Sequence, residues 1–569
     1  MKLRWTERQR WWLLAAGWLV LIVFGIGGFH QQSRDLGLDN DLLDHVYFTL
    51  QLAALDFEGA SSAINWRLQV ARFAAPLMAT TTLAQGASVV FRDQLMRWRA
   101  GRARGHTVVC GLASVGTRLA EALVADGRTV VAIAEQGGLP GAAALERAGV
   151  PVVVGDPTET EVLDVVGAHR AARVVAATDS DAVNVAIAGA VGQLRRPSAS
   201  LPVRVAVRLD DGELAHLLRA TELAGEGAVR LEFFNVHERA AQVLVAAHPL
   251  QPAADPGGNG HLVVMGVGQF GGLLVVAAAQ RWAERDAGPL RVTLIDRHAE
   301  NRLYALTMRH PALQATVVAE AIDLDFAAPS PAAVARFEAR LGEHAPSLVV
   351  AAFDDDALAW TSALFIRQRL TEPVDIVVRT DSDGGLGAHL HEAVGERAAG
   401  GRVAGRVIAF PIHARACTTD LIEGGVREQL ARALHDDHLA RVGTGTGLRA
   451  QWSELSDDQR ESSREAADAI VARLAAIGAR LVPLAHWHGV ADVFTVAELD
   501  SLAAAEHARW KGAREAAGWT WGAVRDDAAQ HNPLLVDWQA LPATARADNV
   551  AAARNLPGLL ARAGFEITR

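Results

Sequence analysis

The chain has 569 residues, half of them apolar, and a formal net charge of −10. This length predicts several domains, and the acidic balance gives no support for nucleic-acid binding. The two cysteines, Cys110 and Cys417, are far apart and suggest neither a disulfide framework nor a metal site, so we expect most of the chain to lie in a reducing compartment.

Two uncharged apolar runs in the first hundred residues predict two membrane spans. Residues 11–28 form a run long enough to cross a bilayer. Residues 73–91 form a second run whose threonines and glutamine indicate contact with other helices or a watery path. Basic residues precede the first run and follow the second, which predicts that both flanks are cytoplasmic. The alternative for the first run is a secretory signal peptide, but no clear cleavage site precedes His30.

A third apolar stretch, residues 46–59, is too short to span a membrane and is typical of a re-entrant segment. The motif D-x-x-Y-F-T-L at 44–50 resembles the pore helix of two-span potassium channels. The T-x-G-Y-G sequence whose carbonyls select potassium in that family is absent, and L-D-F-E-G at 55–59 stands in its place. The acids there are interpreted either as rings that attract cations or as solvated loop acids. The pore candidates are Asp56, Glu58, Thr81 and Gln85.

The stretch that begins at residue 107 has the order strand, glycine turn, helix, strand. The turn is G-L-A-S-V-G at 111–116, and the second strand ends on Glu135, about twenty residues beyond the glycines. Such glycines let the backbone approach a pyrophosphate at the start of the helix, and an acid at this place accepts hydrogen bonds from a ribose diol. The middle glycine of the motif is replaced by Ala113.

Two further strands, at 150–154 and 173–177, run into Gly-Asp at 155–156 and T-D-S-D at 178–181. This block resembles the RCK (TrkA-N) domain, the nucleotide-sensing module of potassium channels and transporters. The resemblance implies NAD(H) or an adenine nucleotide as a regulatory ligand; an ordinary Rossmann dehydrogenase domain is the alternative. The residues that would line the cleft are Gly111, Ala113, Gly116, Glu135, Asp156, Thr178, Asp179 and Asn184.

The pattern repeats about 155 residues later, after a Gly/Pro-rich linker at 251–260. The second copy has a complete G-x-G-x-x-G at 266–271 but lacks the Gly-Asp, since A-E-A at 319–321 stands there. Its ligand therefore differs, or the copy serves only in assembly. Two spans followed by tandem RCK domains resemble ligand-gated potassium channels with a ring of eight such domains, which implies a homotetramer. The second-copy candidates are Gly266, Gly268, Gly271, Asp296 and Asp354.

The chain beyond residue 440 is predicted to be mostly helical and is rich in tryptophan. The motifs E-H-x-R-W, G-W-x-x-G and N-P-x-L at 506–535 resemble the RyR domain, which implies a pocket for a nucleotide-derived signal. Aromatic rings would stack on a base and basic groups would meet phosphate; alternatively, the tryptophans and His507 are core residues. The candidates are Arg464, Glu506, His507, Arg509, Trp510, Trp519, Trp521 and Asn532.

The expected architecture is a membrane α-helical pore-like domain (1–104), two Rossmann-like α/β RCK domains (105–250 and 251–439) and a mostly α-helical RyR domain (440–569). The expected function is a ligand-gated, cation- or potassium-related channel in a bacterial inner membrane. The alternatives are a non-conducting regulatory subunit and a nicotinamide-dependent oxidoreductase. No Tyr-x-x-x-Lys pair, nucleophile elbow or metal-ligand cluster favours an enzyme.

Overall fold

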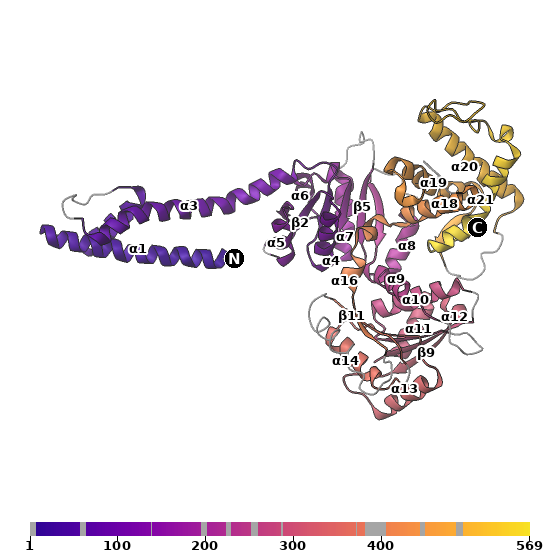
Figure 1. Cartoon of the computed structure of the whole chain (residues 1–569), viewed down its shortest axis with the longest axis horizontal. Coiled ribbons are helices and arrows are strands. Elements are labelled where there is room, and N and C mark those ends of the chain that lie inside the picture. Colours follow the sequence, from indigo (N-terminus) through magenta and orange to yellow (C-terminus); the bar gives the residue numbers. More distant parts are fainter. Residues whose placement is uncertain are drawn as a thin grey trace. The chain divides into compact units, whose positions relative to one another are not determined.

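The chain folds into two compact units, Met1–Arg99 and Ala100–Arg569. Figure 1 shows helices in the first unit and two α/β sheets and a helical part in the second. The computed structural model describes residues 7–56, 64–137, 139–194, 202–222, 229–251, 260–285, 288–370, 373–381, 405–443, 450–484 and 493–569.

The N-terminal unit consists of α1 (Glu7–Leu36), α2 (Leu42–Gln51) with a 3-10 turn after it (η1, Leu52–Ala54), and α3 (Trp66–Ala100). In the described part of the chain, only α1 is both long and apolar enough to cross a membrane, over Trp12–Leu36 with a mean hydropathy of 2.1. Helix α3 contains the second expected span and has 35 residues, but it does not reach that hydropathy. The threonines and the glutamine within 73–91 lower the mean hydropathy of this segment.

Helix α2 lies where the short apolar stretch was expected. Asp41 begins it with a capping box, since its carboxylate accepts a hydrogen bond from the N–H of Asp44, whose carboxylate accepts one from the N–H of Asp41. Gly25 of α1 has no room for a side chain because Thr49 of α2 lies against it. The two helices therefore pack closely. The buried apolar side chains of this unit are Leu21, Phe29, Leu52, Leu68, Ala71 and Ala75.

The first α/β domain has a six-stranded parallel sheet in the order β3-β2-β1-β4-β5-β6. Four of the strands are almost wholly buried, as apolar runs are when helices cover both faces of a parallel sheet. The strands are β1 (Thr107–Cys110), β2 (Val130–Ala134), β3 (Val152–Val154), β4 (Arg173–Ala176), β5 (Val203–Arg208) and β6 (Val229–Phe234). The helices are α4 (Ser114–Ala125), α5 (Pro140–Arg147), α6 (Thr160–Val165), η2 (Ala168–Arg170), α7 (Asp181–Leu194), α8 (Gly212–Glu222) and α9 (Val236–Ala247).

The second α/β domain repeats this strand order, as β9-β8-β7-β10-β11-β12, which confirms the predicted internal repeat. Its strands are β7 (His261–Met265), β8 (Leu290–Asp296), β9 (Val317–Asp323), β10 (Leu348–Ala351), β11 (Ile376–Thr380) and β12 (Val407–Pro411). Its helices are α10 (Gln269–Ala283), α11 (Ala299–Arg309), α12 (Leu313–Thr316), α13 (Pro331–Glu343), α14 (Asp356–Arg367), α16 (Ile412–Ala416) and α17 (Thr419–Glu423).

The two α/β domains share a hydrophobic core. Helix α9, which follows the last strand of the first domain, packs against α10 and α16 of the second. Phe270 of α10 and Phe410 of β12 stack with ring centroids 6.4 Å apart. Leu244 of α9 belongs to the same buried cluster. The two copies are therefore one packed pair.

The C-terminal part is mainly helical, with a short antiparallel strand pair. Helix α18 begins at Val426, ahead of the boundary expected at 440, and packs against α19. Buried residues of this core include Leu430, Ile470, Leu560 and Phe565. The elements are α18 (Val426–Val442), η4 (Trp452–Glu454), α19 (Asp457–Ala476), β13 (Arg480–Pro483), α20 (Val496–Ala516), η5 (Trp538–Ala540), α21 (Ala543–Arg562) and β14 (Phe565–Thr568).

Candidate functional site

The glycine turn of the first α/β domain is built as a phosphate-binding turn. Gly111 has φ +89°, and a Cβ there would lie 2.9 Å from the backbone of Thr178. A Cβ on Gly116 would collide with the carbonyl oxygen of Gly111. Helix α4 starts directly after the turn with Ala113 as its N-cap, which supplies no side-chain hydrogen bond. The first N–H groups of α4 thus have no capping side chain, which is the arrangement that binds phosphate.

Two exposed carboxylates lie at the ends of the neighbouring strands. Glu135 directly follows β2 and Asp156 follows β3, and both are exposed. The carboxylate of Asp156 accepts hydrogen bonds from the hydroxyl (2.7 Å) and the backbone N–H (2.8 Å) of Thr158, which lower the pKa of Asp156. Asp156 is therefore ionised and fixed in place. Glu135 has the position that a ribose diol requires.

Asn184 was expected to line the cleft, but the structure uses all of its polar atoms internally. Its amide oxygen accepts hydrogen bonds from the N–H (2.9 Å) and the hydroxyl (2.8 Å) of Thr178. Its amide nitrogen donates to the carbonyl oxygens of Thr178 (3.0 Å) and Arg208 (3.1 Å). The side chain is fully buried. Asn184 therefore holds the loop after β4 in shape and offers no group to a ligand.

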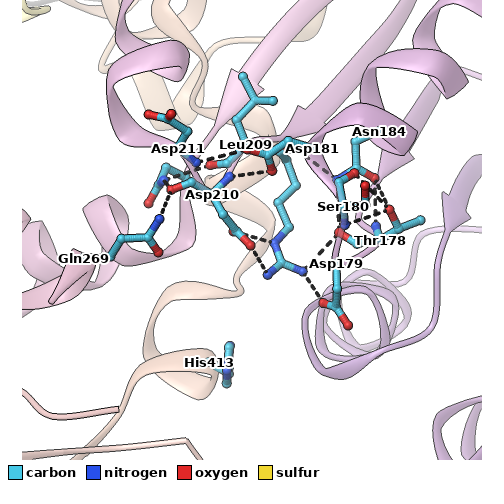
Figure 2. Close-up of polar contacts among 12 residues, drawn as sticks. Thr178, Asp179, Ser180, Asp181, Asn184, Leu209, Asp210, Asp211, Gln269 and His413 are labelled. Carbon is cyan, nitrogen blue, oxygen red and sulfur yellow. Dashed lines mark hydrogen bonds and ion pairs between the residues drawn. The ribbon is translucent and has the colours of Figure 1, made fainter.

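Arg208, at the end of β5, was not among the sequence candidates. Its side chain is nearly buried and donates to the carbonyl oxygen of Thr178 (3.2 Å) and to the carboxylate of Asp179 (2.7 Å). It also holds Asp210 with two hydrogen bonds, of 2.9 and 2.8 Å. Figure 2 shows this cluster. Asp179, a predicted ligand residue, is therefore paired with an arginine of its own domain.

A sequence signal for this arginine exists in both copies. The motif V-R-x-D closes the fifth strand at 207–210 and again at 378–381. In the second copy, Arg379 donates to the carbonyl oxygen of Phe353 (2.9 Å) and to Asp381 (2.7 Å), and it lies 3.4 Å from the predicted residue Asp354. The two arginines thus make matching contacts.

The second glycine turn has the same backbone as the first. Gly266 also has φ +89°, and a Cβ there would lie 2.8 Å from the N atom of Phe353. A Cβ on Gly271 would collide with Gly266, and Gly268 caps α10 without a side-chain hydrogen bond. The acid differs, however. Asp296 accepts hydrogen bonds from the N–H groups of residues 267 (2.8 Å) and 298 (3.2 Å), so its carboxylate is already engaged by its own turn.

Two histidines follow the last strands of the sheets in matching positions. His237 lies in the first turn of α9 and His413 in the first turn of α16. Burial lowers the pKa of both, and His413 lies 3.9 Å from the carboxylate of Asp381. Both side chains are therefore neutral at physiological pH.

In the C-terminal part, six of the eight candidates serve the architecture, among them the stacked pair His507 and Trp510. His507 is buried, hydrogen bonds to the carbonyl oxygen of Val536 (2.8 Å) and packs against Trp510 and Trp538, with ring centroids 5.7 and 5.9 Å away. This supports the core interpretation of that histidine. The other four make ion pairs or turn contacts: Glu506 with Arg473 and Arg509, Arg509 with Glu465, Arg464 with Glu428 and Glu461, and Asn532 with the N–H of Leu534.

Two tryptophans of the same set lie on an exposed loop. Trp521 is 59% exposed, and the half-buried Trp519 has the guanidinium of Arg514 5.1 Å from its ring centroid. A hollow of about 660 Å³ adjoins this loop, lined by residues 522–527 and His531. Of the RyR candidates, these two rings are therefore the ones still open to a ligand.

The pore candidates lie in the N-terminal unit. Asp56 is exposed and follows Leu55, whose φ is +65°. Glu58 lies outside the described residues. The hydroxyl of Thr81 donates to the carbonyl of Leu77 in α3, and the half-buried Gln85 lies four residues further on, on the same helix face.

Two segments of the chain match known domain families. Residues 107–225 match the TrkA-N domain, and residues 495–569 match the RyR domain. No curated protein matches the chain.

Several solved structures are similar to it at low identity. A structure titled GsuK Channel is 19% identical with a TM-score of 0.36, over 72% of this chain and 97% of that one. GsuK bound to ADP is 18% identical (TM-score 0.36; 74% and 100%), and the GsuK channel bound to NAD is 16% identical (TM-score 0.37; 72% and 83%). The family match and the fold together identify the first α/β domain as a TrkA-N domain, as the glycine turn and the T-D-x-D motif predicted.

Proposed function

We propose that this chain is a multi-pass, channel-like membrane protein, with both termini cytoplasmic, whose state is regulated by a nucleotide in the TrkA-N cleft. The observation that carries the proposal is the uncapped start of α4 behind a tight glycine turn, beside the exposed acids Glu135 and Asp156. An anionic phosphate is favoured at the helix start, and Glu135 suits a ribose. NAD(H) or an adenine nucleotide has both groups.

A route from this cleft to the membrane helices is given by chain connectivity. Helix α3 ends at Ala100, and β1, which carries the glycine turn, starts at Thr107. A ligand biases a membrane helix only if it binds two states of the protein with different affinities. The proposed role of the nucleotide is therefore that of an effector, and the permeant species is proposed to be a cation.

Binding is tested by titrating the purified full-length protein with ADP and with NAD in a calorimeter. Ala113→Asp places a carboxylate at the N-cap of α4, where it satisfies the helix but repels phosphate. We expect it to weaken binding by about tenfold or more. Ala113→Ser is the matched control, because serine caps the helix without charge and should keep most of the affinity. Equal binding by the wild type and both variants would show that the nucleotide phosphate does not bind at the start of α4.

Function is tested by ion flux from liposomes that hold the full-length chain, with potassium, sodium or chloride gradients. Flux that depends on ADP or NAD, and that Ala113→Asp makes insensitive, would support the regulated channel. Binding without flux under any gradient would instead favour a non-conducting regulatory subunit, the interpretation that the missing T-x-G-Y-G sequence allows.

A further inference from the structure

Asp210, in the short connection between β5 and α8, uses every polar group that it has. Its N–H donates to the carboxylate of Asp181 (2.8 Å), and its carboxylate holds the guanidinium of Arg208. Its carbonyl oxygen accepts two hydrogen bonds, from the side-chain amides of Asn235 (3.0 Å) and Gln269 (2.7 Å). Figure 2 shows Gln269 and Asp181 on either side of this connection.

These partners belong to three different parts of the molecule. Arg208 donates hydrogen bonds to Thr178 and Asp179, beside the first glycine turn. Asn235 is the N-cap of α9, the helix that packs against the second α/β domain. Gln269 is the first residue of α10 and lies inside the second glycine turn, 266–271. Asp210 thus joins one cleft to the glycine turn of the other by direct hydrogen bonds.

In the described part of the chain, no matching hydrogen bond runs from the first glycine turn to the second domain. Ser114 has the motif position in the first turn that Gln269 has in the second. Its side chain is much shorter, and no hydrogen bond joins it to Asp381, the counterpart of Asp210, among the described residues. Of these two matching residues, only Gln269 is hydrogen bonded to the other domain in the part of the chain that the structure describes.

We propose that the connection 209–211 couples the two glycine-turn clefts, so that a nucleotide in one changes the affinity of the other, with Gln269 and Arg208 as positioning residues. This inference rests on the proposed function, since it requires nucleotide binding. A phosphate at the start of α10 fixes the second turn and the first residue of that helix. Gln269 then holds the carbonyl of Asp210, and the carboxylate of Asp210 holds Arg208 against the loop that lines the first cleft. The effect is reciprocal, because coupling between two binding sites always is.

One substitution in each glycine turn allows binding at the two clefts to be measured separately. Ala113→Asp is expected to weaken the first cleft by about tenfold or more, as above, and Gly268→Asp to weaken the second in the same way, because both residues are N-caps without a side-chain bond. A Cβ on Gly268 would meet nothing nearer than 3.6 Å, so the substitution is tolerated sterically. Calorimetric titration of the full-length protein with ADP gives single-site affinities in the two variants and a two-site isotherm in the wild type. In the wild type, we expect a nucleotide at one cleft to change the affinity of the other cleft by about fivefold or more.

Gln269→Met then removes the amide and keeps the length of the side chain. In this variant, we expect a nucleotide at one cleft to change the affinity of the other by about twofold or less. The single-site affinities, measured with Gln269→Met in each weakened background, should change less than the coupling does. Gln368→Met is the matched control, because Gln368 is exposed at the end of α14 and its side chain makes no hydrogen bond among the described residues.

The outcomes separate this inference from the proposed function. Undiminished coupling in Gln269→Met, or two sites that bind independently in the wild type, overturns the inference. A wild-type protein that binds one nucleotide per chain also overturns it and leaves the proposed function intact. Cooperativity that persists in both weakened variants arises between copies of the chain and does not count as support. No binding at either cleft overturns the proposed function itself.

Discussion

Single residues of the TrkA-N motif divide into exposed ones, which a ligand could reach, and buried ones, which brace the loop after β4. The spacing T-D-x-D…N cannot distinguish the two, because an amide that binds a ligand and an amide that braces a loop are the same residue at the same position. The structure decides through burial and partners. Asn184 is buried with four hydrogen bonds, whereas Glu135 and Asp156 are exposed at strand ends.

Asn184→Asp tests this division at the residue scale. A carboxylate cannot donate to the carbonyl oxygens of Thr178 and Arg208, and it places a charge in a buried site. We expect a loss of at least about 2 kcal/mol in stability, seen as a lower apparent melting temperature without any nucleotide. Asn549→Asp, on the half-exposed face of α21, is the control and should melt close to the wild type. If the residue acted only as a ligand group, melting without nucleotide would not change.

Glu222 gives a prediction about pH. It is buried, accepts hydrogen bonds from the N–H groups of Phe233 (2.6 Å) and Val426 (3.3 Å), and burial raises its pKa to about 8. Because the folded state holds this proton more tightly than the unfolded state, its contribution to stability is complete below about pH 4.5 and is lost as the pH rises through about 8.

We therefore expect the apparent melting temperature of the wild type to fall between pH 6 and pH 9 more than that of Glu222→Gln, which cannot ionise. Each unit of pKa displacement corresponds to about 1.4 kcal/mol, so even part of this displacement is measurable. Glu338→Gln removes an exposed carboxylate paired with Arg369 and should follow the wild-type pH profile. Parallel pH profiles for the wild type and Glu222→Gln would contradict the prediction.

At the scale of elements, strands with uniform apolar runs were predictable, and strands with mixed composition were not. The strands predicted at 150–154 and 173–177 are present as β3 (Val152–Val154) and β4 (Arg173–Ala176), within two residues of their predicted limits. In strand β9, V-V-A-E-A-I-D, a glutamate ends the apolar run after three residues, and in β11, I-V-V-R-T, an arginine does the same. Their places follow from the sheet, which needs a third and a fifth strand to repeat the first copy.

The candidate clefts were predictable for a related reason. A tight turn requires glycine at fixed positions, and a Cβ at Gly111 or Gly266 would meet backbone atoms. Such steric demands require a recognisable sequence motif. Arg208 and Arg379 belong to a weaker motif, the repeated V-R-x-D, which can be recognised only when the two domains are aligned by their fold. The contact between Gln269 and Asp210 has no such motif, because it joins two domains.

At the scale of the whole second unit, the C-terminal helical part is attached to the first α/β domain by charge. Arg427 of α18 is almost completely buried and pairs with Asp468 (2.8 Å) and Glu461 (2.7 Å) of α19. Arg230 of β6 lies 3.1 Å from the same Asp468. Asp468 therefore connects α18 and α19 of the C-terminal helical part to β6 of the first α/β domain through ion pairs.

Asp468→Asn tests this attachment. The substitution leaves the buried Arg427 without half of its negative partners and removes the contact to Arg230. Arg427 keeps its ion pair with Glu461, so the substitution weakens the attachment of this desolvated charge without leaving it unpaired. We expect faster hydrogen exchange in both β6 and α19, measured by mass spectrometry on the full-length protein, since both elements lose an anchor. Asp537→Asn removes the exposed pair with Lys511 and should leave exchange in those elements unchanged. Faster exchange confined to α19 would contradict the prediction, because it would mean that Asp468 does not anchor β6 to the helical part.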